Sequence, residues 1–213
     1  MNYPSVTSIL DIIQPKQLTN YFKNNSKNKI EKKLVETADF GSFGHRYIEM
    51  DFKGIKIEID NEPMKKWAEN WHILKEKHQI KVFKSEQVVI SQKYGYAGSY
   101  DHWGTCDGKP CIIDIKTGFF SNKVGLQMAA YRQGLIEVEG LSKQDVSELG
   151  LVGIQIHRDG REPKVFKYEH LEWVITKFLH TLECWKHENF QTLAKMEWPY
   201  LKRDCVKEYY ESL

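Results

Sequence analysis

The sequence predicts an α/β domain in which a central mixed sheet is flanked by helices. Apolar residues recur with helical spacing before residue 80 and again after residue 122, whereas the segments between them alternate with the period of two that is typical of strands. The chain has 213 residues, 41% of them apolar, which is enough to bury one core. We therefore expect a single domain with helical additions at both ends.

Helices are expected throughout the first third of the chain. The first segment offers Thr7 or Ser8 as an N-cap, with a break at Pro15. A second helix is predicted over about Lys27–Ala38, and a third over 44–52, after two glycines. The many lysines of this region fit a solvated helix face as well as a contact with nucleic acid.

A fourth helix is predicted over 62–78, because Pro63 suits its first turn and apolar residues follow at core spacing. The residues at these core positions are Met64, Trp67, Trp71 and Leu74.

The period changes after residue 80. Strands are predicted over 81–92, 94–104 and 109–118, and the Asp107-Gly108 pair is typical of a hairpin turn between the last two. These strands form the expected centre of the sheet.

The remaining elements complete the predicted layers. A helix is expected from Asn122 to about Val138, and a hairpin over 151–168 turns at Asp159-Gly160. One or two amphipathic helices are expected after Glu169.

Acidic residues converge on one end of this sheet. Side chains in a strand alternate between faces, so Asp114 and Lys116 share a face, and Glu86 and Asp101 lie on the two preceding strands. Clustered carboxylates repel one another unless a cation neutralises them, and Mg²⁺ prefers oxygen ligands. Lys116 beside them can orient a water, accept its proton if the lysine pKa is depressed, or neutralise developing charge. Taken alone, Asp-x-Lys also fits an ordinary surface ion pair.

Three motifs, in their order and spacing, extend this pattern: GYAGSYD at 95–101, IIDIKTG at 112–118 and QMAAY at 127–131. Together they resemble the RecB-like exonuclease branch of the PD-(D/E)XK nuclease superfamily, in which Gly-x-x-Asp is followed by Asp-hydrophobic-Lys and then Gln-x-x-x-Tyr. Gly44-His45 and Glu86 match the upstream part of the pattern, and the resemblance covers roughly residues 41–135. Tyr100 stands where the superfamily's nominal name has proline, a departure common in this branch.

The resemblance implies a restriction-endonuclease-like core, a site for Mg²⁺ or Mn²⁺, with two ions, and cleavage of DNA phosphodiesters. By the same resemblance the catalytic residues are Lys116, Asp114, Asp101 and Glu86, with Glu86 as an auxiliary acid. The implied metal ligands are His45, Asp101, Asp114 and the carbonyl of Ile115.

Three further residues are candidates for contact with the substrate. The resemblance has Gln127 and Tyr131, one turn apart on a helix face, supporting the site and touching the DNA backbone, although a purely structural role in the core is the alternative. Lys123 is a candidate phosphate contact, which would position DNA without reading its bases. For His45, the alternative to a role as metal ligand is a purely structural role in helix packing.

Composition limits the remaining possibilities. The 31 basic and 29 acidic side chains leave a net charge of only +2, so any surface for DNA must be local. The four cysteines form no CxxC pair, and their placement departs from the iron–sulfur pattern of some relatives, so we expect no iron–sulfur cluster. We find no signal peptide, membrane span or P-loop in the sequence, and expect a cytoplasmic protein that uses no ATP.

These observations predict one nuclease domain over 1–213, with a basic helical region over 1–40, a core over 41–170 and C-terminal helices over 171–213. We expect a metal-dependent DNA exonuclease that acts on DNA with a free end. The resemblance to small phage-type and mitochondrial genome-maintenance exonucleases suggests a role beside replication, recombination or repair proteins. The alternatives are a structure-specific or flap endonuclease with the same site, and a catalytically silent nucleic-acid-binding module.

Overall fold

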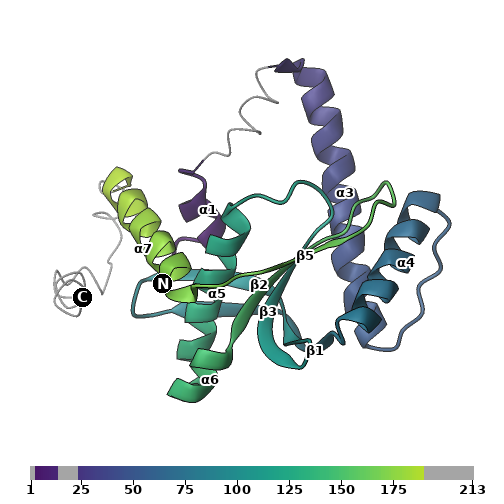
Figure 1. Ribbon diagram of the computed structural model, residues 1–213. Coiled ribbons are helices and arrows are strands. Elements are labelled where there is room, and N and C mark those ends of the chain that lie inside the picture. Colours follow the sequence, from purple (N-terminus) through teal and green to yellow (C-terminus); the bar gives the residue numbers. More distant parts are fainter. Residues whose placement is uncertain (1–2, 14–23, 190–213) are drawn as a thin grey trace.

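The computed structural model of the chain describes residues 3–13 and 24–189 and contains a mixed five-stranded sheet (Figure 1). The strands are β1 (Lys81–Ser91), β2 (Tyr96–Cys106), β3 (Lys109–Lys116), β4 (Gly150–Gln155) and β5 (Lys164–Lys167). They lie in chain order across the sheet, and every neighbouring pair is antiparallel except β3 and β4, which are parallel. The predicted α/β class with a mixed sheet is confirmed.

Helices cover both faces of the sheet. They are α1 (Val6–Leu10), α3 (Lys27–Phe52), α4 (Glu62–Lys77), α5 (Lys123–Glu139), α6 (Lys143–Glu148) and α7 (Leu171–Glu188). Figure 1 shows α3 and α4 on one side of the sheet and α1, α5 and α7 on the other. Consecutive side chains of β3 enter the two cores in turn: Ile112 packs in the α5 layer, whereas Ile113 and Ile115 pack beneath α3 and α4.

Helix α4 forms where its core spacing predicts it. Asn61 caps its first turn, Pro63 lies in that turn, and Trp67, Trp71 and Leu74 are buried. The predicted N-cap of α1 is wrong, because Ser5 accepts a hydrogen bond from the amide of Ser8 and so takes the position expected for Thr7 or Ser8.

The two helices predicted on either side of Gly41 and Gly44 are one continuous helix, α3. Glycine lowers helix propensity but does not forbid a helix, and here tight packing needs its missing side chain. A Cβ on Gly44 would lie 3.0 Å from ring atoms of Trp67 and 3.0 Å from the methyl of Thr117. The glycine therefore lets α3 approach α4 and the end of β3, and the expected division at residue 40 falls inside this helix.

The connection from β3 to β4 contains both a predicted and a missed helix. Helix α5 agrees with the prediction, whereas the short α6, which begins with a capping box between Ser142 and Asp145, was not predicted. Buried Arg132 of α5 donates hydrogen bonds to the carbonyls of Leu149 and Val146 and so fastens this crossover.

The later hairpin is confirmed by the antiparallel pairing of β4 and β5, with Gly160 in the left-handed conformation in their connection. The expected break at Pro15 and a second C-terminal helix fall outside the described residues. Within the described ranges, none of the helices has the length and apolar character needed to cross a membrane.

Candidate active site

Three carboxylates lie in a row across β1, β2 and β3. The pairs on either side of Glu86 in the β1–β2 ladder place it opposite Asp101. The β2–β3 ladder ends at the pair of His102 and Ile113, and Asp101 and Asp114 are the residues that adjoin this last pair. Glu86 has φ of 50°, a left-handed conformation that non-glycine residues rarely adopt and that costs about 1 kcal/mol or more. The ladder on both sides of Glu86 holds this residue in its strained conformation.

Helix α3 brings His45 to this row. The Nδ1 atom of His45 lies 3.7 Å from Oδ2 of Asp101 and 3.8 Å from Oε1 of Glu86. Both distances exceed a normal hydrogen bond, and Nδ1 is buried with no hydrogen-bond partner among the described residues. Burying a nitrogen without a hydrogen-bond partner costs free energy. A group bound between His45 and the two carboxylates would supply the missing partner.

Lys116 is held by the buried carboxylate of Asp114. Its Nζ donates a hydrogen bond of 2.8 Å to Oδ1 of Asp114 and lies 4.0 Å from Oδ2 of Asp101. The same Oδ2 of Asp101 accepts a bond of 3.1 Å from the amide of Ile115. Asp101 therefore links the histidine side of the site to the lysine side.

The electrostatics of the row reflect its burial and its crowded charges. Burial, together with the facing Asp101, raises the pKa of Asp114 to about 6, against the opposing effect of Lys116. Burial and Asp101 likewise raise the pKa of Glu86. Burial acts to lower the pKa of Lys116, but the carboxylates of Asp114 and Asp101 outweigh it and raise that pKa, which favours an ammonium over a neutral base.

The donor set of this site fits a divalent cation. One atom each from His45, Glu86 and Asp101 lie within 4.8 Å of one another, and ligand atoms about 2.1 Å from one Mg²⁺ lie about 3–4 Å apart. Two carboxylates and one imidazole suit Mg²⁺ or Mn²⁺, with the imidazole favouring the softer Mn²⁺. The Glu86 side chain is 53% exposed, which leaves the group open on one side to water and substrate.

The structure groups the candidate ligands differently from the sequence expectation. Glu86, expected as an auxiliary acid, joins His45 and Asp101 directly, whereas the carboxylate of Asp114 is engaged by Lys116. Ile115, expected to act through its carbonyl, contacts Asp101 through its amide. The roles of Asp114 and Ile115 as ligands stay predictions.

Helix α5 places Gln127 and Tyr131 beside the row. Gln127 donates a bond of 2.8 Å to the hydroxyl of Tyr131, and burial raises the pKa of that hydroxyl to about 12. The Tyr131 ring packs against Gly98 of β2, where a Cβ would overlap Cε1 of the ring. The glycine of the Gly-x-x-Asp motif therefore makes room for the tyrosine of the next motif.

Lys123 lies at the first residue of α5, where its Nζ is 3.8 Å from Oδ1 of exposed Asp11. The first turn of α5 contains no acidic residue, and its N-cap Asn122 makes no side-chain cap. Lys123 and the helix dipole therefore place positive charge at this end of α5, which exposed Asp11 partly balances.

A second group of potential ligands lies at the β2–β3 hairpin, formed by His78, Cys106 and Asp107. Here Asp107 already accepts hydrogen bonds from His78 and from the ammonium of Lys167, and burial raises the pKa of the Cys106 thiol to about 11. Because its carboxylate is neutralised and its thiol protonated, this group has less need of a cation than the group around His45.

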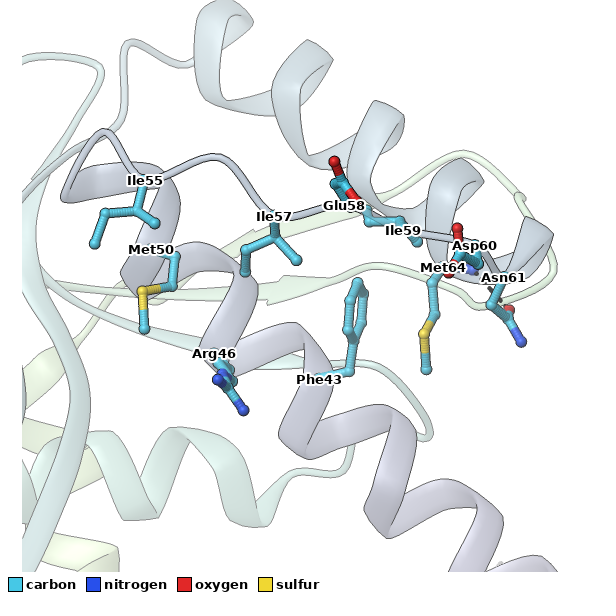
Figure 2. Close-up of a pocket in the computed structure, with 10 residues that line it drawn as sticks. All are labelled: Phe43, Arg46, Met50, Ile55, Ile57, Glu58, Ile59, Asp60, Asn61 and Met64. Carbon is cyan, nitrogen blue, oxygen red and sulfur yellow. Dashed lines mark hydrogen bonds between the residues drawn. The ribbon is translucent and has the colours of Figure 1, made fainter.

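A cavity of about 450 Å³ lies between α3, the segment after it and the start of α4 (Figure 2). Its lining includes Phe43, Arg46, Met50, Ile57, Ile59 and Met64. Adjacent helix positions are rotated by about 100°, so Arg46 faces this cavity while its neighbour His45 faces the carboxylates. The cavity is thus distinct from the candidate active site.

Comparison with known proteins finds neither a family model nor a curated protein that matches the sequence. Among solved structures, the chain is similar to LHK-Exo in a crystal structure of its complex with dAMP, with 14% identity, a TM-score of 0.33, and coverage of 96% of this chain and 94% of that chain. A likeness at this level decides neither fold nor activity, so the proposals below stand on the geometry of the site and on its motifs.

His102, to which the sequence assigned no role, also supports the site. It follows Asp101 in β2, its Nδ1 shares a hydrogen bond of 2.9 Å with Ser85, and burial lowers its pKa to about 4. The neutral His102 of β2 therefore bonds Ser85 of β1, the residue that precedes the strained Glu86. A lone histidine beside a motif carries no signal for such a role; only the strand register reveals it.

Proposed function

We propose that this chain is a divalent-metal-dependent DNA exonuclease that hydrolyses phosphodiester bonds. The observation that carries the proposal is the buried, unpartnered Nδ1 of His45, which faces Glu86 and Asp101 beside the Lys116–Asp114 pair. A pure nucleic-acid-binding module would gain nothing from acids clustered where a polyanion must bind. A role in replication, recombination or repair rests on the motif resemblance alone.

His45, Glu86 and Asp101 would hold the metal. Asp114 would join them through Oδ2, which is buried without a hydrogen-bond partner among the described residues, although Lys116 Nζ lies 2.7 Å away. A bound Mg²⁺ or Mn²⁺ would supply charge to polarise the phosphoryl oxygens and to lower the pKa of the attacking water. Glu86 is the most exposed of the three and would lie nearest the entering substrate.

Lys116 would act as a positioned ammonium. The carboxylates of Asp114 and Asp101 raise its pKa and favour the ammonium, which would orient the attacking water and neutralise charge developing on the phosphoryl oxygens. Asp114 fixes the direction of the ammonium through its bond of 2.8 Å. Loss of one such preorganised donor typically lowers turnover by about 10²–10³.

The flank of the site suits a phosphate backbone. The α5 N-terminus places Lys123 at the positive end of the helix dipole, where it faces exposed Asp11 at 3.8 Å. A DNA phosphate there would replace Asp11 as the partner of Lys123. Gln127 and Tyr131, one and two turns further along α5, would support the same strand.

The test is degradation of end-labelled single- and double-stranded linear DNA by the wild type and by Lys116→Ala, with Mn²⁺, Mg²⁺ or a chelator. We expect release of label that requires metal and falls by at least about 10² in the variant. Binding without cleavage under every condition would instead support the silent module. Arg161→Ala, which alters an exposed ion pair in the β4–β5 connection, is a matched control expected to retain activity.

Circular DNA separates the proposal from its nearest alternative. An exonuclease needs a free end, so covalently closed and uniformly labelled circles should resist the enzyme under conditions where the same DNA, linearised, is degraded. Cleavage of the circles at a rate similar to the linear form would assign an endonuclease to the same site.

A further inference from the structure

The loop that joins Lys116 to α5 is fastened on both sides of one exposed aromatic residue. Thr117 packs against α3, with its methyl 3.0 Å from the position of a Cβ on Gly44. The carbonyl of Gly118 accepts a bond of 2.6 Å from Gln155 of β4. The chain directly after the catalytic lysine is therefore held in place by α3 and β4.

Phe120 anchors the loop on its other side. Its ring stacks on Phe166 of β5, with centroids 4.2 Å apart and planes 15° apart. It also covers Gly153 of β4 so closely that a Cβ there would overlap the ring. Phe120 is thus a partly buried anchor for the segment.

Phe119, between these anchors, is 59% exposed. Burial of a phenylalanine side chain is worth about 1.5–3 kcal/mol, yet Phe119 faces solvent three residues after Lys116 and four before Lys123. Because both neighbours along the chain are held by contacts, the backbone of Phe119 is fixed in place. The ring is an exposed aromatic surface on the loop that directly follows Lys116.

We propose that Phe119 stacks on an unpaired nucleobase of the DNA strand whose phosphate enters the site, and that the substrate therefore presents single-stranded DNA there. This inference rests on the proposed function. An aromatic ring can stack on a base of any type, provided that no neighbouring base of a duplex covers the face of that base. An unstacked terminal nucleotide would meet this requirement, and Lys123 would then contact a neighbouring phosphate.

The experiment measures dissociation constants for a single-stranded oligothymidylate in a Lys116→Ala background, where cleavage should be at least about 10² slower. We expect Phe119→Ala to weaken binding by about tenfold, within the range of one base–aromatic stack, and Phe119→Trp to restore it. Trp173→Ala, which removes an aromatic residue 63% exposed on α7, is the matched control and should bind as the parent does.

Oligonucleotides with one abasic site, moved stepwise from the end, test whether the ring meets a base. When the abasic site lies at the position under Phe119, the parent should bind the oligonucleotide about tenfold more weakly. The affinity of the Phe119→Ala variant should not change. A blunt duplex should bind both proteins equally.

Equal binding of the oligothymidylate by Phe119→Ala and its parent would overturn the stacking inference while the proposed function stood. An equal loss with every abasic oligonucleotide would also overturn it, since the effect would then be structural. Failure of the wild type to bind or cleave any DNA would overturn the proposed function, and this inference with it.

Discussion

At the residue scale, the Nδ1 atom of His45 decides whether the acidic row is a metal site. Replacing His45 with alanine removes one of three converging donors, so the affinity for Mn²⁺ should fall by at least about tenfold, as loss of even outer partners does at metal sites. Titration of Mn²⁺ by calorimetry measures this without reference to activity. Nuclease activity with Mn²⁺ should equal or exceed that with Mg²⁺.

The control for this prediction is His78→Ala, which removes a histidine from the hairpin group that Lys167 already neutralises. Its Mn²⁺ affinity should match the wild type. Unchanged Mn²⁺ affinity and unchanged rate in His45→Ala would remove His45 from the ligands and return it to helix packing.

Two glycines give opposite predictions because their surroundings differ. Gly98→Ala forces a Cβ into the Tyr131 ring and to within 3.0 Å of Val6, and overpacking of this kind costs about 1–3 kcal/mol. Gly41→Ala meets only Thr117 at 3.7 Å inside α3, where helix propensity favours alanine by about 1 kcal/mol. Urea denaturation should show the first variant destabilised and the second stabilised; destabilisation of both would mean that α3 needs Gly41 for another reason.

At the scale of elements, Asp51 joins α3 to α4. Its Oδ2 accepts bonds of 2.9 Å from the Trp71 indole and 2.7 Å from Lys75. Partial burial acts to raise the pKa of Asp51, but the bonds from Lys75 and Trp71 outweigh it, so the pKa is lowered. The bonds of Asp51 to Trp71 and Lys75 hold α4 against α3, the helix that carries His45 over the sheet.

The pH dependence follows from the sign of this shift. A carboxyl with a lowered folded-state pKa stabilises the fold fully above its unfolded pKa of about 3.9, and that contribution is lost as the pH falls through the folded value. Asp51→Asn keeps an acceptor for Trp71 but loses the charge, so it should cost about 1.5 kcal/mol at pH 7. The difference from wild type should shrink below about pH 4 in denaturation curves measured across pH.

Asp159→Asn is the control for Asp51, because Asp159 pairs with Arg161 in an exposed part of the chain. Such surface pairs contribute little, and we expect no measurable change in stability. A difference between Asp51→Asn and wild type that stayed constant down to low pH would show that the charge of Asp51 is not what stabilises the pair of helices.

Elements with strong local signals could be predicted from the sequence, and those decided by packing could not. The strands around Asp114 and the helix over Trp67 and Trp71 carry clear periods, so their existence and type were evident. The continuity of α3 depends on close contact of Gly44 with Trp67, which local sequence does not encode. The same limit applies to the site: alternation places Asp114 with Lys116, but only the packing of α3 on the sheet shows that Glu86 joins His45.

At the scale of the whole molecule, all three layers contribute to one site. His45 comes from the α3–α4 layer, the carboxylates and Lys116 come from the sheet, and Gln127 and Tyr131 come from the opposite layer. Each helical layer packs a separate core against the same sheet, and β3 supplies residues to both. Neither core can lose its packing without exposing a face of the strand that carries Asp114.

This shared strand predicts that the domain unfolds in a single cooperative step. Far-ultraviolet circular dichroism reports all layers. In a variant whose four other tryptophans are replaced with phenylalanine, fluorescence reports Trp67 and Trp71 in the α3–α4 core, so the two urea transitions should coincide. Metal-dependent activity should disappear in the same transition, because the site exists only while both layers are docked. A fluorescence transition at lower urea than the circular dichroism transition would instead mean that α3 and α4 detach first, leaving the sheet and α5 folded without His45.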